Sequence, residues 1–304
     1  MLEIKEVKIE NILKISNLGL LICALGYENR ASFFAKLICQ NVINIKCKIC
    51  VLLVEDYNQN EYKSFSDLGF KFINQNELHS FIIEYSETEN LVDYSVMMKA
   101  LYSKIIKQIN KPEFENKNFI FSYTPAKFEN TESGHKNVAE IYPIFFKDNF
   151  IIHNNIENIL ILSLGYERNS AIGIVENLEI SYNNVFVLIN KDSENSEHYL
   201  KCIEHNEDFL ELFPKKNIFE INFFNLNEVL SYMNSIILSE SNKSKQIIIA
   251  PLGVKTFSLL SMVLCNHYNN VIFYNVTSNS NKNYNKNPDV DKELYIYKMT
   301  FTSN

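Results

Sequence analysis

The chain has 304 residues, of which 46% are hydrophobic, and a formal net charge of −7 with a pI near 5.5. This length accommodates two domains of ordinary size, and the acidic balance excludes an extended nucleic-acid surface, which requires a basic face. The sequence has neither an apolar run of about 18 residues nor a leader pattern, and its cysteines lie mostly in apolar segments. We therefore expect a cytoplasmic protein with reduced thiols and no membrane association.

Strand-like and helix-like segments alternate through the first half of the chain. The first strand is a nearly continuous apolar run, which is typical of a strand buried on both faces of a sheet. The helices are recognised by apolar residues three and four positions apart. The expected strands are 18–25, 46–56, either 80–87 or 90–95, and 117–124, and the expected helices are 31–42 and 96–109.

The second half repeats this alternation, with strands again separated by helical patterns. Such βαβ units predict mostly parallel sheets, and we predict two tandem Rossmann-like α/β domains at 1–150 and 151–304, joined within 146–158. The expected strands are 158–164, 183–190, 217–224, 245–251 and 270–276, and the expected helices are 170–180, 196–213, 226–240 and 255–268.

Both halves contain the same short stretch after their first strand. Residues 20–32 read LLICALGYENRAS and residues 159–171 read ILILSLGYERNSA. Four shared letters recur by chance, but here the preceding strand and the following helix recur with them. The repeat therefore predicts that the two domains arose by internal duplication.

These two turns carry candidate ligand-binding residues, because ligands of parallel sheets bind beyond the carboxyl ends of the strands. Glycine admits close backbone approach, tyrosine can stack on a base, and glutamate can accept hydrogen bonds from ribose. Arginine can hold a phosphate or carboxylate, although it can equally pair with the neighbouring glutamate. The candidates are Gly26, Tyr27, Glu28, Arg30, Gly165, Tyr166, Glu167 and Arg168.

A second candidate site lies in IIIAPLGVKTFSLL, residues 247–260. A strand ends at Pro251, a turn contains Gly253, and a helix begins at Lys255 and Thr256. A lysine and a hydroxyl beside free helical N–H groups favour phosphate binding. The stretch is not a Walker A loop, because it lacks the upstream glycine and the order Gly-Lys-Thr. The alternative is a lysine that merely faces solvent.

Two further strand ends carry polar residues. Asp93 and Ser95 could supply acid–base or nucleophilic chemistry, which makes them the catalytic candidates if the protein is an enzyme; Asp93 could instead be a helix N-cap. Tyr123 and Thr124 end the last strand of the first half, and we expect them to occupy the place that the Pro-Leu-Gly turn holds in the second half.

No metal site or cofactor is predicted. Cys47 and Cys50 are three residues apart within a strand, so they point to opposite faces and have no second cysteine pair. His198, Cys202 and His205 share one helix face, but a polar helix flank explains this spacing better than a metal triad does.

The Gly253–Thr256 turn resembles the Gly-x-Lys element of CRISPR-associated Rossmann-fold (CARF-like) sensor domains, although Leu252 replaces their second glycine. That resemblance implies a nucleotide ligand of the cyclic oligoadenylate kind. The chain is also similar to bacterial two-repeat proteins that accompany antiviral defence genes. These carry a Gly-Tyr/Phe-Glu-x-Arg turn in each half, an Asp-x-Ser-x-Met stretch like Asp93–Met97 and a Pro-Leu-Gly-x-Lys turn.

Three functions remain open at this point. The first is a nucleotide- or phosphate-binding sensor or accessory component of a prokaryotic defence system, acting with a protein effector. The second is an enzyme, a hydrolase or transferase, acting on a nucleotide or nucleic-acid fragment. The third is a non-catalytic scaffold in a defence complex, and the fold alone does not choose among them.

Overall fold

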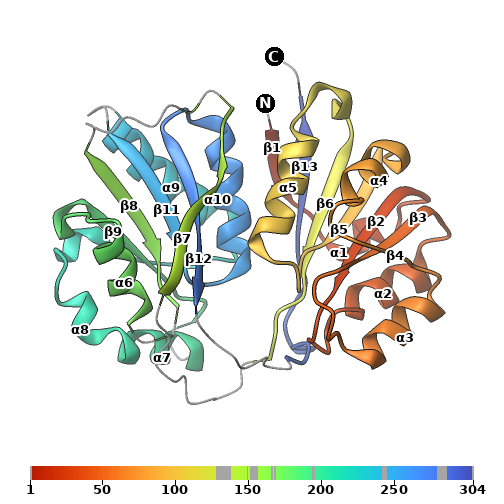
Figure 1. The fold of residues 1–304 in the computed structure, drawn as a ribbon, viewed down its shortest axis with the longest axis horizontal. Coiled ribbons are helices and arrows are strands. Elements are labelled where there is room, and N and C mark those ends of the chain that lie inside the picture. The colour runs from red at the N-terminus through yellow and green to blue at the C-terminus, as the bar shows by residue number, and fades with distance from the viewer. Residues whose placement is uncertain are drawn as a thin grey trace. The chain divides into compact units, whose positions relative to one another are not determined.

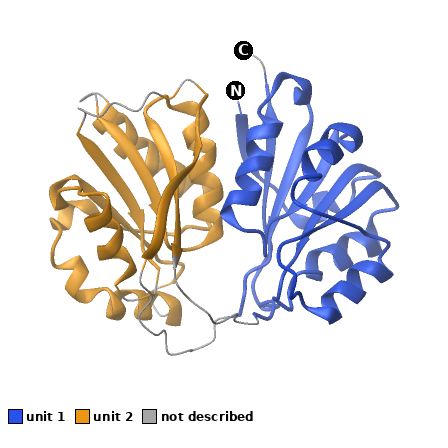
Figure 2. Cartoon of the chain, viewed as in Figure 1, with its two compact units in different colours: residues 1–127, 282–304 blue, residues 128–281 orange. Residues whose placement is uncertain are grey.

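The structure is a computed structural model, and it describes residues 2–127, 138–148, 150, 157–165, 167, 169–193, 196–241, 245–278 and 286–302. The chain divides into two compact units (Figure 2). Unit 1 comprises residues 1–127 and 282–304, and unit 2 comprises residues 128–281. Each unit is an α/β fold with one mostly parallel sheet, of seven strands in unit 1 and six in unit 2, which confirms the predicted fold class.

In unit 1 the strand order is β1-β13-β6-β5-β2-β3-β4. Strands β2 to β6 are parallel, whereas β13 pairs antiparallel with β6 and β1 pairs antiparallel with β13. The elements are β1 (Leu2–Glu6), α1 (Ile9–Ile12), β2 (Asn17–Leu25), α2 (Phe33–Asn41), β3 (Asn44–Leu52), α3 (Gln59–Asp67), β4 (Lys71–Ile73), α4 (Leu78–Tyr85), β5 (Glu89–Asp93), α5 (Lys99–Ile109), the 3-10 helix η1 (Pro112–Phe114), β6 (Asn118–Tyr123) and β13 (Tyr295–Phe301).

In unit 2 the strand order is β10-β9-β8-β11-β12-β7, and only β7 is antiparallel to its neighbour (Figure 1). The elements are β7 (Val138–Phe146), β8 (Asn158–Ser163), α6 (Ser170–Asn177), the 3-10 helix η2 (Tyr182–Asn184), β9 (Val185–Asn190), α7 (Glu197–His205), α8 (Glu207–Leu210), the 3-10 helix η3 (Lys215–Asn217), β10 (Ile218–Ile221), α9 (Leu226–Ser241), β11 (Gln246–Pro251), α10 (Lys255–His267) and β12 (Val271–Ser278).

The two sheets share one topology over six strands, to which unit 1 adds β1. In each, the first parallel strand lies centrally, the second and third extend to one side, and the fourth and fifth extend to the other. β2 therefore corresponds to β8, β5 to β11 and β6 to β12, and each fifth strand carries an antiparallel sixth. This is the doubly wound Rossmann order, with a switch point between the first and fourth strands. The common order is what an internal duplication would leave.

The compact units differ from the sequence-based ranges 1–150 and 151–304, because the sixth strands change sheets. β7 follows β6 in the chain but pairs with β12, and β13 follows β12 but pairs with β6. The ranges 1–150 and 151–304 thus separate the two repeats, whereas the compact units contain one strand from the other repeat. We call 1–150 the first repeat and 151–304 the second repeat.

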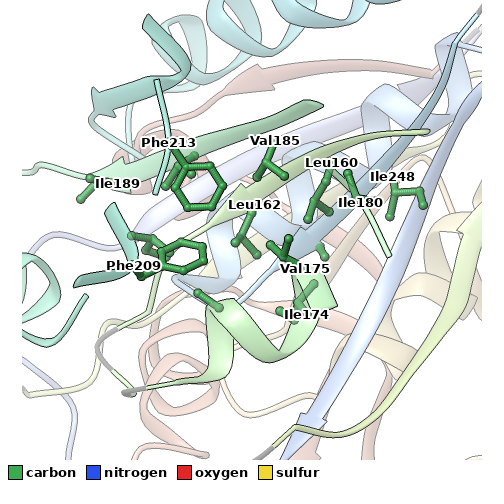
Figure 3. Packing of buried hydrophobic residues seen from close by; sticks show 14 of the residues in the cluster. Leu160, Leu162, Ile174, Val175, Ile180, Val185, Ile189, Phe209, Phe213 and Ile248 are labelled. Atoms are coloured by element: carbon green, nitrogen blue, oxygen red, sulfur yellow. The ribbon is translucent and has the colours of Figure 1, made fainter. Parts of the chain in front are cut away.

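The core of unit 2 shows why its strands read as apolar runs. Leu160, Leu162 and Ile248 point from the sheet to one face, where they meet Ile174 of α6 and Phe209 of α8 (Figure 3). The alternate residues of the same strands are equally buried, and α9 and α10 contact β11. Burial on both faces is the reason that polar residues occur mainly at the strand ends.

Several elements depart from the sequence-based assignments. Residues 80–87, one of two alternatives for the third strand, lie mostly in helix α4, and the strand is the other alternative, β5. Four strands, β1, β4, β7 and β13, were not expected. β4 has only three residues, and β7 contains Pro143, which cannot donate a ladder hydrogen bond and suits an edge strand.

Candidate functional site

The turn after β2 begins the switch point of unit 1. Gly26 follows the buried strand directly, and its carbonyl accepts a hydrogen bond from Asn58 N at 2.9 Å. Tyr27 is 37% exposed, so its ring is accessible at this edge. The turn thus combines a fixed backbone with one exposed aromatic side chain.

Arg30 is buried and bound within unit 1. Its Nε donates to Glu28 Oε2 at 2.5 Å, one terminal nitrogen donates to the Ser95 carbonyl at 3.0 Å, and the other donates to the Thr124 carbonyl. Burial lowers the pKa of Arg30, but Tyr123 and Glu28 beside it raise the pKa more, and the net pKa lies above the ordinary value. Arg30 therefore ties three loops together, and the expected alternative, that it pairs with Glu28, is confirmed.

Asp93 and Ser95 belong to the same buried network. The Ser95 hydroxyl donates to Asp93 Oδ1 and accepts a hydrogen bond from Thr124 N at 2.8 Å. Ser95 N also donates to Asp93 Oδ1, at 3.0 Å. Asp93 is not the N-cap of α5, because Met98 holds that position. With Ser95 fully buried and Asp93 only 2% exposed, both residues organise the loop rather than face solvent.

The start of α2 is also occupied by a side chain of unit 1. Ser32, its N-cap residue, donates its backbone N–H to Glu61 Oε2 at 2.6 Å. Both residues are buried. A carboxylate at a helix N-terminus is electrostatically favourable, so Glu61 fills the place where an anionic ligand would otherwise bind.

In unit 2 the turn after β8 has a different residue at the position of Arg30. Aligned on Gly-Tyr-Glu, Arg30 corresponds to Asn169, which adopts a left-handed φ of 66°, a conformation that Asn tolerates. Glu167 is half-buried, and its Oε2 would lie 2.7 Å from a Cβ placed on Gly165. Tyr166 and Arg168 lie outside the described residues.

The turn after β11 meets the turn after β8 backbone to backbone. Leu252 N donates to the Ser163 carbonyl at 3.0 Å, and Gly253 N donates to Ser163 Oγ at 3.4 Å. A Cβ on Gly253 would lie 2.8 Å from the carbonyl oxygen of Leu164, and one on Gly165 would lie 3.0 Å from that of Leu252. Both glycines are therefore required sterically at the unit 2 switch point.

Helix α10 begins at this switch point, immediately after Pro251–Val254. Its N-cap residue, Val254, has no side chain that can accept a hydrogen bond, and Lys255 and Thr256 form its first turn. Thr256 is fully buried, and its hydroxyl has no hydrogen-bond partner among the described residues. A thirteen-residue helix thus presents its positive end, a lysine and an unpaired hydroxyl together.

The expected equivalence of Tyr123–Thr124 with the Pro-Leu-Gly turn is wrong. β6 corresponds to β12, so the counterpart of the Pro-Leu-Gly turn is the Asp93–Ser95 loop after β5. The structure instead places Tyr123 beside Arg30, whose Cζ lies 5.5 Å from the ring centroid, and Thr124 in the Ser95 network. The three-residue strand β4 has no clear sequence signal. Without it β6 counts as the fourth parallel strand, whereas it is the fifth.

Two polar residues that support the unit 2 turns were not among the candidates. Ser163 ends β8, and its Oγ accepts a hydrogen bond from Gly253 N. The Asn206 side-chain amide donates to the Gly165 carbonyl at 3.0 Å. The only sequence signal for Ser163 is a polar residue at the end of an apolar run. Asn206 follows α7, and nothing in its local sequence indicates the contact.

The other polar groupings are not brought together into sites. All six cysteines are free, and Cys202 donates to the Gly165 carbonyl at 3.4 Å. No group of three or more His, Cys, Asp or Glu side chains suited to a metal occurs among the described residues. Within the same residues, every helix is too short or too polar to cross a membrane.

A cavity of about 880 Å³ lies at the opposite, amino-terminal edge of the unit 1 sheet. It is bordered by the first residues of three strands, Asn17, Asn44 and Glu89, and by the ion-paired Lys46 and Glu87. None of the candidate ligand residues lines it. No protein-family model matches this chain, and no curated protein matches it significantly.

Proposed function

We propose that this protein binds a small phosphorylated ligand, of the nucleotide class, at the switch point of unit 2. The observation that carries the proposal is the uncapped N-terminus of α10 with the unpaired, fully buried hydroxyl of Thr256 in its first turn. Buried polar groups are nearly always paired, so the unpaired Thr256 hydroxyl at a helix start supports a ligand oxygen as its partner.

The neighbouring residues suit an anion. Lys255 adds a positive charge to the first turn of α10, and Gly253 has no side chain beside the Leu164 carbonyl. The dipole of α10 favours a phosphate oxygen at this position. Lys255, Thr256 and the Gly253 backbone would hold the phosphate, and Glu167 is the described residue best placed for a ribose.

Unit 1 supports the choice of unit 2 by contrast. There Glu61 accepts from the start of α2 and Arg30 is bound by Glu28 and two carbonyls, while the buried Ser32 and Thr124 hydroxyls have no hydrogen-bond partner among the described residues. A ligand there would displace bonds that already exist. The burial of Asp93 and Ser95 likewise favours binding over catalysis.

We further propose that the ligand is a signal read by a separate protein effector, which is the role that the CARF-like resemblance implies. In this role the ligand is bound and retained unchanged. A hydrolase or transferase would instead convert it, so incubation followed by mass spectrometry of the ligand separates the two functions.

The test uses the full-length protein and the shift of its melting temperature with inorganic phosphate, mononucleotides and cyclic oligoadenylates. A ligand at 100 times its Kd stabilises the folded state by about 2.7 kcal/mol. We expect Lys255→Ala and Thr256→Val to remove most of this shift. Thr256→Val should not lower the ligand-free melting temperature, because the hydroxyl has no partner among the described residues to lose.

Lys216→Ala is the matched control, because Lys216 is an exposed lysine of unit 2 away from the switch point. It should keep the full ligand shift. The proposal fails if no phosphorylated compound raises the melting temperature, or if both site variants respond to the ligand as the unmodified protein does.

A further inference from the structure

The two repeats exchange their sixth strands. In each repeat the fifth parallel strand, β6 or β12, is followed in the chain by an antiparallel strand, β7 or β13. That strand leaves its own repeat and pairs with the fifth strand of the other one: β7 with β12, and β13 with β6. The exchange is reciprocal, since each repeat gives one strand and receives one.

The strand received by unit 1 is built into its core. Three side chains of β13 are at most 1% exposed: Ile296, Tyr297 and Met299. Thr300 Oγ1 donates to Asn118 Oδ1 at 2.7 Å, and Lys298 Nζ lies 3.0 Å from Glu89 Oε1. The second repeat therefore supplies apolar, hydrogen-bonded and charged contacts that the sheet of the first repeat would otherwise lack.

The strand received by unit 2 is integrated in the same way. Phe145 of β7 is fully buried opposite Phe273, and Val138 and Ile141 pack against the hydrophobic cluster of unit 2. Asn275 Nδ2 donates to Tyr142 Oη at 3.0 Å. Without β7, the edge of β12 would expose unpaired backbone groups, which proteins generally avoid.

We infer that each repeat is an obligate partner of the other, as in a strand-exchanged dimer whose two subunits have become one chain. The surface involved is the free edge of the fifth strand, and its partner is the sixth strand of a second repeat. The connection between β7 and β8 then holds the repeats together covalently but is not needed for the assembled fold.

The test cuts this connection in the full-length protein. A site for a specific protease is inserted between Asp148 and Glu157, and the purified protein is cleaved into its two repeats. We expect the fragments to elute together on size exclusion in native buffer and to separate only in denaturant. Separation in native buffer would overturn the inference.

Cysteine pairs then identify which strands are joined. Asn118→Cys with Thr300→Cys links β6 to β13, and Ile141→Cys with Val276→Cys links β7 to β12, following the observed register. After oxidation and cleavage, both pairs should keep the fragments linked on a denaturing gel until reductant is added. The four single-cysteine variants control for the native thiols.

The gel result decides between reciprocal exchange and its alternatives. If neither pair links the fragments, each sixth strand stays in its own repeat and the inference is wrong. If one pair alone links them, the exchange is one-way and the reciprocal partnership is wrong. A pair that disturbs folding is recognised by its melting temperature before cleavage, and the elution test, which needs no cysteine, then decides the outcome.

Discussion

Replacing Gly253 by alanine tests whether the two unit 2 turns meet backbone to backbone. The added Cβ would lie 2.8 Å from the Leu164 carbonyl oxygen, which is closer than such atoms are normally found. Relief requires one turn to move, because the obstacle is backbone rather than a flexible side chain. Overpacking of this kind costs about 1–3 kcal/mol. For a unit of this size, that cost lowers the melting temperature by about 2–12 °C.

Gly26→Ala in unit 1 is the matched control. The nearest atom to its added Cβ is Leu53 Cδ1 at 3.5 Å, an ordinary van der Waals contact, so we expect no loss of stability. A small gain of about 0.4–1 kcal/mol is expected, because alanine restricts the unfolded chain. Urea unfolding followed by circular dichroism measures both variants. Equal stability of Gly253→Ala and the unmodified protein, or a larger loss for Gly26→Ala, would refute the proposed packing of the turns.

The remaining predictions concern buried groups. Glu28→Gln leaves the Arg30 charge without its carboxylate, and breaking the pair should lower the free energy of unfolding in urea by about 3 kcal/mol. A decrease below about 0.5 kcal/mol would show that the pair is not structural. Burial, with a smaller effect of the nearby Glu167, raises the pKa of Cys202 to about 12, so its thiol should not react with a disulfide reagent near pH 8 until the protein unfolds. The buried thiols Cys23, Cys50 and Cys265 should behave alike, and only Cys39 and Cys47 should react in the native protein; rapid reaction of more than two thiols would contradict the burial.

The parallel core was predictable from sequence because burial on both faces leaves a strong local signal. β2 and β8 read as apolar runs followed by glycine, and the helices after them carry the expected periodicity. The edge strands were not predictable in this way. β7 mixes exposed with buried residues and β13 mixes partly buried with buried ones, and their sheet membership depends on pairing with a distant part of the chain.

The candidate site shows the same division between local and distant information. The turn at Gly253 and the helix start at Lys255 follow from strand, glycine and helix signals in one short stretch. The burial of Arg30 does not, because it depends on carbonyls from Ser95 and Thr124, far away in sequence. A charged residue in a turn looks the same in sequence whether it faces a ligand or closes a loop.

The two switch points illustrate how a duplicated turn can acquire two roles. In unit 1 the charged residues near the turn are buried in its interior. Glu61 accepts a hydrogen bond at the start of α2, and the Arg30 guanidinium lies between three loops. In unit 2 the turn after β11, whose counterpart in unit 1 is the Asp93–Ser95 loop, contains Gly253, and the Thr256 hydroxyl beside it has no hydrogen-bond partner among the described residues. Each repeat supplies the sheet edge of the other, so under the proposed function unit 1 would be retained for its structure even if it binds no ligand. If the proposed function is right, the hydrogen bonds of Arg30 stabilise unit 1 as that structural partner, and an anion bound at the unit 2 turn would add its binding free energy to the stability of the fold.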